Sequence, residues 1–230
     1  MNRFVLIKFK IIAIVAVSLL FPVEIFAQVG ETVCSPFGYS VFTINGIFTD
    51  ETGAKENKDK LKNRLPPTFN NQPLTIDYLH NPSHLAGLGD LAMSIYQKVF
   101  DNEAVADYDL VEMIKDASEK VKTQKLLIVA HSQGNFYANS FYDIVAGKTD
   151  GVPAESIGVY GVATPAGRVA GGGQWLTSDT DKIITDLVAL FPFKKIMAPN
   201  TSIALEEGGD AKGHNFSGVY LKHRGSQIVS

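Results

Sequence analysis

The sequence feature that most constrains the fold is an apolar run at residues 125–130, which leads without a break into His131-Ser132-Gln133-Gly134. After its first lysine the run contains only leucine, isoleucine, valine and alanine, a pattern typical of a strand buried on both faces of a parallel sheet. Residues 135–146 continue with the apolar spacing of a helix. A buried strand followed at once by a helix requires a sharp turn, and the sequence puts Ser132 in that turn.

Strand and helix patterns alternate along the rest of the chain. Further strands are expected at residues 39–44, 74–79 and 156–162, with a short last strand at 174–177, and helices at residues 51–64, 84–99 and 109–122. Strands that alternate with helices imply right-handed crossovers and a mostly parallel sheet. Because such a sheet needs cover on both faces, the expected fold class is α/β, a three-layer sandwich with a central sheet flanked by helices.

Residues 1–27 have the composition of a secretory signal peptide. Basic residues lie near the amino terminus, an apolar run follows at residues 11–21, and a cleavage site precedes Gln28. The apolar run is shorter than a membrane span requires, so no stable span is expected in the mature protein; an uncleaved anchor is the alternative. The sequence therefore predicts a secreted or periplasmic protein.

The remaining residues, 28–230, are expected to form a single domain, since no internal repeat or linker divides them. Loss of three of the 21 basic and one of the 24 acidic residues with the signal leaves 18 and 23, a formal charge of −5. This charge argues against nucleic acid and anionic membrane surfaces as partners. The one cysteine, Cys34, cannot form an internal disulfide. The oligomeric state stays open.

Metal and cofactor binding are not expected. His80 and His84 lie four residues apart, but no His-Glu-x-x-His pattern surrounds them. The sequence therefore predicts chemistry carried by side chains alone, with neither a metal nor a cofactor.

Ser132 is the candidate nucleophile. A serine hydroxyl reacts only when a base removes its proton and hydrogen-bond donors stabilise the oxyanion that forms. A sharp turn between strand and helix exposes the hydroxyl and directs the next N–H and the positive end of the helix towards the developing charge. Such a turn needs small residues two positions to either side, and Ala130 and Gly134 meet this need. A serine that merely caps an ordinary turn is the alternative.

With the strand before it, the segment at residues 131–134 resembles the nucleophile elbow of α/β-hydrolases, especially the bacterial lipase-like and esterase-like members. Asn45-Gly46-Ile47, after the first strand, resembles their His-Gly-x oxyanion motif. The resemblance runs from about residue 39 to 222 and implies an α/β-hydrolase-type fold. It also implies that the backbone N–H groups of Ile47 and Gln133 are the oxyanion donors.

Two positions depart from the family pattern. Ala130 stands where the first glycine of the elbow is usual, and Asn45 stands where the oxyanion motif has histidine. The second departure matters more, because the histidine side chain helps to hold the oxyanion loop.

The family order, serine then acid then histidine, selects the base. Of the five histidines only His214 and His223 follow Ser132. His214 comes at the end of a glycine-rich segment and before an expected helix start, which resembles the family position. His223 lies between two basic residues and is expected to be solvated. The resemblance therefore implies that His214 is the general base.

Two aspartates compete for the role of the acid. Asp181 is followed by x-Ile-Ile, which resembles the family pattern Asp-x-Val-Val, whereas Asp179 is the alternative acid two residues earlier. Asp186 and Asp210 are more distant candidates. The acid would fix the imidazole tautomer and stabilise its charged form.

This constellation implies acyl transfer to Ser132 followed by hydrolysis. Carboxylic ester is the expected bond, with a small-molecule or lipid ester as the binding partner, because lipase-like sites carry glutamine after the serine. Phe48, Leu85, Leu88 and the run at residues 187–193 are candidates for the acyl-chain wall, and that run also for a mobile cover. Amide or thioester chemistry, and a hydrolase-like protein that only binds, stay open as alternatives.

Overall fold

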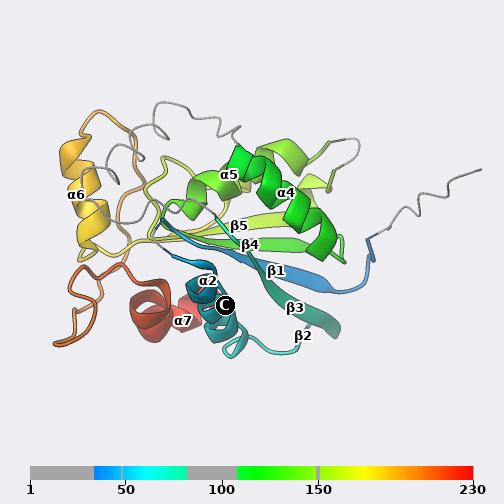
Figure 1. The fold of residues 1–230 in the computed structure, drawn as a ribbon, viewed down its shortest axis with the longest axis horizontal. Coiled ribbons are helices and arrows are strands. Elements are labelled where there is room, and N and C mark those ends of the chain that lie inside the picture. Colours follow the sequence, from blue (N-terminus) through cyan, green and yellow to red (C-terminus); the bar gives the residue numbers. More distant parts are fainter. Residues whose placement is uncertain (1–33, 48, 82–107, 149–150, 230) are drawn as a thin grey trace, which may run out of the picture. The chain divides into compact units, whose positions relative to one another are not determined.

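The computed structural model describes residues 34–47, 49–81, 108–148 and 151–229. The expected signal peptide, the expected helix at residues 84–99 and the wall candidates Phe48, Leu85 and Leu88 lie outside these ranges. The strands are β1 (Tyr39–Ile44), β2 (Thr68–Phe69), β3 (Gln72–Leu79), β4 (Leu126–His131), β5 (Ile157–Val162) and β6 (Trp175–Leu176). They form one sheet in the order β2-β3-β1-β4-β5-β6 (Figure 1).

Five of these strands are parallel, and only the short edge strand β2 is antiparallel to its neighbour β3. The order reverses next to β1, because the chain first moves outwards to β3 and then returns to place β4 on the other side of β1. In doubly wound sheets ligands bind at such a switch point, beyond the carboxyl ends of the strands. Here Asn45 follows β1 and Ser132 follows β4, so the topology brings both to this point.

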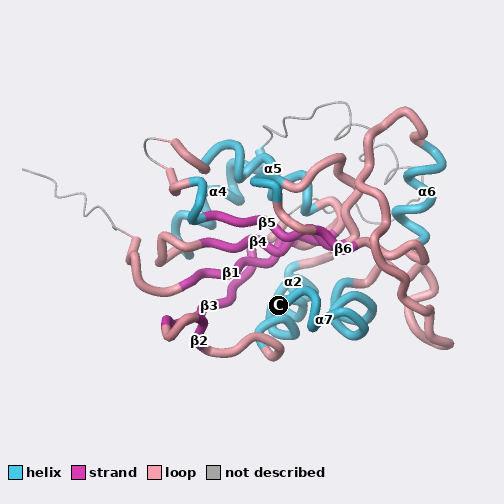
Figure 2. The backbone as a smooth tube through the Cα atoms, turned by 180° about the vertical axis from the view of Figure 1, so that it is seen from behind, coloured by secondary structure: helices cyan, strands magenta, loops and turns pink. Residues whose placement is uncertain are grey.

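Helices cover both faces of the sheet. They are α2 (Glu51–Lys62), α4 (Tyr108–Lys120), α5 (Gly134–Val145), α6 (Lys182–Leu190) and α7 (Lys222–Val229), with a π-helical segment at Phe216–Leu221 directly before α7. Helices α4 and α5 pack on one face and α2 with α7 on the other, as the views from both sides show (Figures 1 and 2). The structure thus confirms the expected α/β fold class, a three-layer sandwich with a mostly parallel central sheet flanked by helices.

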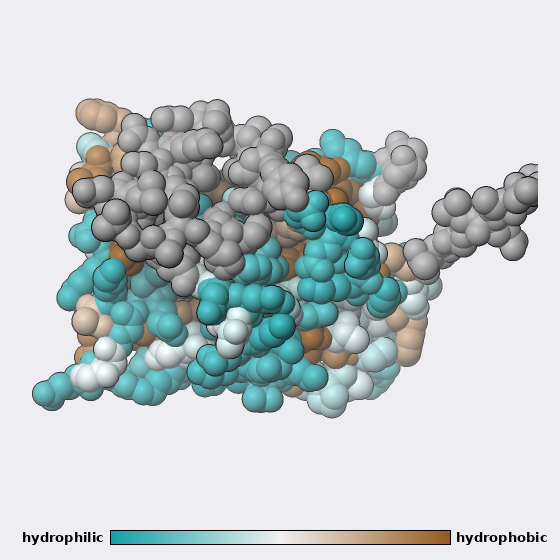
Figure 3. All heavy atoms as spheres, in the orientation of Figure 1, coloured by the Kyte–Doolittle hydropathy of each residue, from teal (hydrophilic) through white to brown (hydrophobic). Residues whose placement is uncertain are grey.

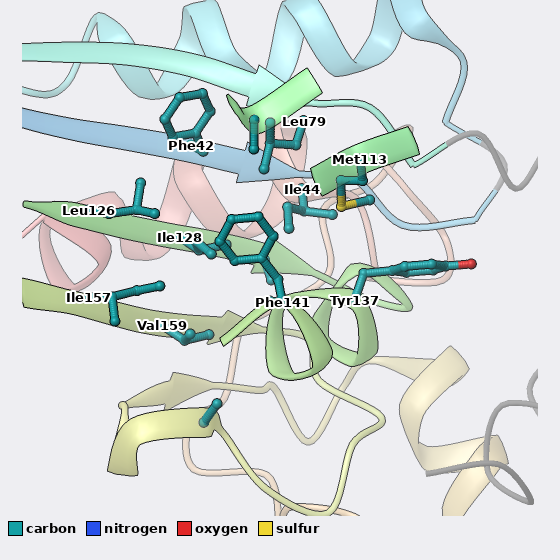
Figure 4. Packing of buried hydrophobic residues seen from close by; sticks show 14 of the residues in the cluster. Phe42, Ile44, Leu79, Met113, Leu126, Ile128, Tyr137, Phe141, Ile157 and Val159 are labelled. Carbon is teal, nitrogen blue, oxygen red and sulfur yellow. The ribbon is translucent and has the colours of Figure 1, made fainter. Parts of the chain in front are cut away.

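Alternation along the strands divides the core into two clusters. In β1, Phe42 and Ile44 point towards α4 and α5, whereas Val41 packs on the opposite side. Leu126 and Ile128 of β4 join the first cluster, where they meet α5 (Figure 4). This is the period of two expected for strands with both faces covered.

The prediction that β4 is buried throughout was wrong at one position. Leu127 is 37 % exposed, although Val129, two residues later on the same face, is buried. Cover on this face therefore begins only towards the carboxyl end of the strand, which is the end that carries the site.

Helix α6 and the hairpin β2–β3 were not expected. No helix was expected over residues 182–190, but Leu187 belongs to α6 and is buried. Apolar residues three and four positions apart and an aspartate cap before Lys182 produce this helix. In the hairpin, Asn70 and Asn71 have φ of 48° and 58°, the left-handed backbone that a two-residue turn needs and that asparagine tolerates.

On the side shown in Figure 3, hydrophilic residues form most of the surface that the described chain presents, and hydrophobic atoms form smaller areas. None of the helices in the described ranges has the length and hydrophobicity to cross a membrane.

Candidate active site

Ser132 lies in a strained turn between β4 and α5. Its φ is +56°, a left-handed backbone that costs a residue with a side chain on the order of 1–2 kcal/mol. Its N–H donates to the carbonyl of Val162 in the neighbouring strand over 3.0 Å, which anchors the turn to the sheet. Strain of this kind persists only where the surroundings enforce it, as at functional sites.

Two close approaches explain the small residues around Ser132. A Cβ atom added to Gly134 would lie 2.7 Å from the carbonyl oxygen of Asn45, so only glycine fits where α5 begins. A Cβ atom on Gly46 would lie 2.6 Å from Ser132 Cβ and 3.0 Å from its Oγ. The loop after β1 therefore lies directly against the serine.

The structure brings His214 to the serine from a distant part of the chain. His214 Nε2 and Ser132 Oγ are 2.8 Å apart. His214 lies on an irregular segment that ends at the π-helical turn, and its side chain is 17 % exposed. His223 lies elsewhere, with its Nε2 atom 3.3 Å from a carboxylate oxygen of Glu206.

Asp181 is the carboxylate next to His214. Its Oδ2 and Oδ1 atoms lie 2.8 and 3.0 Å from His214 Nδ1, and its side chain is fully buried. Oδ1 also accepts from the N–H groups of Ile183 and Ile184, so the same carboxylate caps α6. Because a carboxylate only accepts, Nδ1 carries the proton and Nε2 is left to accept from the serine hydroxyl.

The other aspartates do not reach this imidazole in the described chain. Asp179 and Asp186 are exposed, and the N–H of Asp179 donates to the carbonyl of Thr201. Asp210 touches His214 only through its backbone: its Oδ2 accepts from the His214 N–H over 2.8 Å.

Tyr220, in the π-helical segment, completes the hydrogen bonds of the buried acid and was not found from the sequence. Its hydroxyl donates to Asp181 Oδ2 over 2.8 Å and accepts from the N–H of Ser178 over 3.0 Å. Burial raises the pKa of Tyr220 well above its ordinary value, and the nearby Asp181 carboxylate raises it further. The phenol therefore stays protonated and donates permanently.

Asn45 holds the loop after β1 by its own hydrogen bonds. The side chain is buried; its amide nitrogen donates to the carbonyls of Thr49 and Asn81 over 3.2 and 3.3 Å, and its oxygen accepts from the Asn81 N–H over 2.9 Å. The amide nitrogen of Asn81 in turn donates to Gln133 Oε1 over 3.0 Å. This network ties the loop to the elbow, a task that the resemblance assigns to a histidine. Asn81 was not found from the sequence.

Ile47 and Gln133, the expected oxyanion donors, lie on the two segments that this network joins. Gln133 is completely buried and Ile47 is 9 % exposed. Neither of their N–H groups is a donor in a hydrogen bond between described residues. Gln133 directly precedes the start of α5, where the helix dipole favours negative charge.

His131, directly before the nucleophile, is also buried. Its Nε2 lies 2.7 Å from the carbonyl oxygen of His214. Burial, together with the neighbouring His214, lowers the pKa of His131 to about 3, so the ring is neutral near pH 7. In the described ranges no group of three or more histidine, cysteine or acidic residues is arranged to hold a metal ion.

Comparisons with solved structures find two cutinase structures. One is described as a novel cutinase-like protein from Cryptococcus sp., with 13 % identity over 60 % of this chain and 58 % of that chain and a TM-score of 0.35. The other is Trichoderma reesei cutinase in complex with a C11Y4 phosphonate inhibitor, with 15 % identity over 66 % of this chain and 65 % of that chain and a TM-score of 0.37. This chain spans less than two thirds of the length of either protein.

No family model matches the sequence, and no curated protein matches it. Since both TM-scores lie below 0.5, we infer the function from the geometry of the site.

Proposed function

We propose that this chain is a serine hydrolase that cleaves carboxylic esters with Ser132 as nucleophile, His214 as general base and Asp181 as the acid. The observation that carries the proposal is the continuous row of hydrogen bonds from Ser132 Oγ through both ring nitrogens of His214 to the buried Asp181, each 2.8 Å long. Strained backbone at Ser132 supports it, because an ordinary capping serine needs no left-handed turn.

In the first half of the reaction Ser132 Oγ attacks the carbonyl carbon of the ester, and its proton passes to His214 Nε2. Asp181 keeps the imidazole in the tautomer that can accept this proton and stabilises the positive ring that results. The tetrahedral intermediate then expels the alcohol, which takes the proton from His214. The acyl group remains on Ser132.

The oxyanion of the intermediate would bind the N–H groups of Ile47 and Gln133. Two such donors, fixed before the reaction begins, stabilise developing charge without reorganisation, and loss of one typically costs about 10²–10³ in rate. The network of Asn45, Asn81 and the Gln133 side chain supports this assignment because it fixes both backbone segments.

In the second half of the reaction, water is the nucleophile and Ser132 is the leaving group. A water molecule loses a proton to His214 Nε2 and attacks the acyl carbon, and the collapse of the second intermediate returns the proton to Ser132. The products are the carboxylic acid and free enzyme. None of these steps needs a metal or a cofactor.

A carboxylic ester of a small molecule or lipid is the proposed substrate, and residues 28–230 are proposed to act as one exported domain. The signal-peptide composition of residues 1–27 favours export. The formal charge of the mature chain, 18 minus 23 or −5, disfavours polyanionic partners. The elbow, with glutamine after the serine, resembles lipase-like sites and favours esters over amides.

Hydrolysis of p-nitrophenyl esters of short and medium acyl chains by the purified protein tests this proposal. We expect turnover that falls by about 10³-fold or more in Ser132→Ala and that is unchanged in Ser118→Ala, a control at an exposed serine on α4. Equal activity of wild type and Ser132→Ala would refute it. Absence of turnover at every chain length, with no covalent labelling of Ser132, would favour a protein that only binds.

A further inference from the structure

The chain around His214 has little regular structure of its own. Residues 204–215 contain neither helix nor strand, and Gly208 and Gly213 adopt positive φ of 74° and 67°. A base on such a segment cannot keep a reactive distance to Ser132 through secondary structure. Other contacts have to hold it.

Asp210 holds this segment from one side. Its Oδ2 accepts from the N–H groups of His214 and Asn215, each over 2.8 Å, and its Oδ1 accepts from the N–H of Lys212 over 3.0 Å. Although burial acts in the opposite direction, these three donors lower the pKa of Asp210, so it accepts as a carboxylate near neutral pH. Three N–H groups that converge on one carboxylate fold the segment into a compact loop.

His131 holds the same residue from the other side. The carbonyl of His214 can only accept, so His131 Nε2 carries the proton and donates over 2.7 Å. The His131 ring also lies against the rings of His214 and Phe216, with centroids 4.9 and 5.6 Å away. His131 Nδ1 has no hydrogen-bond partner among the described residues, so Nε2 supplies the one polar attachment of this ring.

We infer that His131 and Asp210 are positioning residues that clamp the backbone of His214 by its carbonyl and its N–H, and thereby keep its imidazole in line between Asp181 and Ser132. The inference rests on the proposed function. It assigns Asp210, a sequence candidate for the acid, to the backbone of the base and not to its ring. It also makes the elbow carry two adjacent groups: the nucleophile itself and the donor that holds the base.

Two substitutions test the clamp in the purified protein. His131→Phe keeps a ring of similar size but removes the donor, and Asp210→Ala removes the acceptor. Controls are His223→Phe, the same substitution at another histidine, and Glu207→Ala, which removes a different acidic side chain of the same segment; neither position has these backbone contacts. Thermal unfolding identifies variants that are folded, and Asp210→Asn, which retains one acceptor oxygen, replaces Asp210→Ala if the latter does not fold.

For the clamp variants we expect kcat for a p-nitrophenyl ester to fall by about 10–10²-fold, because a small displacement of a catalytic group has such an effect. KM should stay within about threefold, since neither side chain is placed to bind substrate. His131→Gln, whose amide can donate to the same carbonyl, should recover most of the lost kcat. The double variant should lose less than the product of the single losses, because both act on one residue. Unchanged kcat, or a loss confined to KM, would overturn the inference.

Hydrogen exchange separates failure of the clamp from failure of the proposed function. In Asp210→Ala the amides of His214 and Asn215 should exchange about tenfold faster or more, the equivalent of one net hydrogen bond. His131→Phe should also accelerate exchange at residues 212–215. This readout needs no ester turnover. If wild type is inactive and exchange rises as expected, the clamp stands while the proposed function fails; unchanged exchange in both variants overturns the clamp.

Discussion

At the scale of single residues, the site depends on how closely Gly46 approaches Ser132. A Cβ atom at Gly46 would lie 2.6 Å from Ser132 Cβ, nearer than a Cβ atom comes to a non-bonded atom in folded proteins. Gly46→Ala should therefore displace the loop or the serine and lower kcat/KM by about 10²-fold, because displacements near 1 Å have this effect.

The control for this substitution is Gly158→Ala in β5, where the added Cβ would make an ordinary 3.4 Å contact with Leu127. Both variants are compared by ester hydrolysis and by circular dichroism. Full activity of Gly46→Ala would contradict the contact between the loop and the nucleophile.

Tyr220→Phe tests the hydrogen bond to the buried acid. Loss of a donor to a buried carboxylate should lower the free energy of unfolding by about 1.5–3 kcal/mol, and kcat/KM should fall because Asp181 is held less firmly. Tyr160→Phe is the control, since its hydroxyl makes a long bond of 3.2 Å to a backbone carbonyl. Equal unfolding midpoints in denaturant for the two variants would argue against the special role of Tyr220.

At the scale of elements, Asp181 serves α6 and the imidazole at once, and two substitutions separate these tasks. Asn at this position can still cap the helix but cannot stabilise a charged imidazole, whereas Ala does neither. Both Asp181→Asn and Asp181→Ala should lose about 10³-fold or more in kcat/KM.

The two variants should differ in free energy of unfolding, because only asparagine can still cap α6. Asp181→Ala should be less stable than Asp181→Asn by about 0.5–2 kcal/mol in urea unfolding, the usual contribution of a cap residue. Asp179→Asn, at an exposed position, should keep both activity and stability. If Asp179→Asn abolished activity and Asp181→Asn did not, the acid would have been misassigned.

Local signals allowed several elements to be predicted. The apolar run of β4, the stripe of α4 and the small residues of the elbow each depend on residues close in sequence, and all three elements form, although Leu127 of β4 is exposed. Helix α6 was missed because the apolar run at residues 187–193 was considered only as an acyl-chain wall or a mobile cover, although Asp181, Ile184 and Leu187 have helical spacing.

The groups that could not be predicted act across long sequence separations. Tyr220 meets Asp181 39 positions away, and Asn81 meets Gln133 52 positions away. The Asn81 contact depends on strand order and the Tyr220 contact on the π-helical turn, and no local pattern encodes either. The chain order of the resembled family selected His214, and its Asp-x-Val-Val pattern favoured Asp181; both signals come from a known topology and not from local structure.

At the scale of the whole molecule, buried His131 makes stability depend on pH. Its pKa is about 3 in the folded chain and near 6.5 when exposed, so between these values the unfolded chain binds one more proton. Stability therefore decreases as pH falls below 6.5, by up to about 1.4 kcal/mol per pH unit from this residue.

Urea unfolding of wild type and His131→Gln from pH 7.5 to pH 5 checks this. Wild type should lose about 2 kcal/mol more than the variant over this range, because the variant lacks the buried imidazole. The difference between the two curves removes the contribution of the other histidines. Parallel curves would contradict a neutral, buried His131.

The central claim is that Ser132 is a nucleophile activated by His214, and covalent labelling of the purified protein with a fluorophosphonate tests it most directly. The adduct is mapped by peptide mass spectrometry in wild type, Ser132→Ala, His214→Ala and the control Ser118→Ala. We predict one adduct, on Ser132, that forms equally in the control, forms at least about 10³-fold more slowly in His214→Ala and is absent in Ser132→Ala. An adduct on another serine, or labelling that persists in Ser132→Ala, would contradict the account.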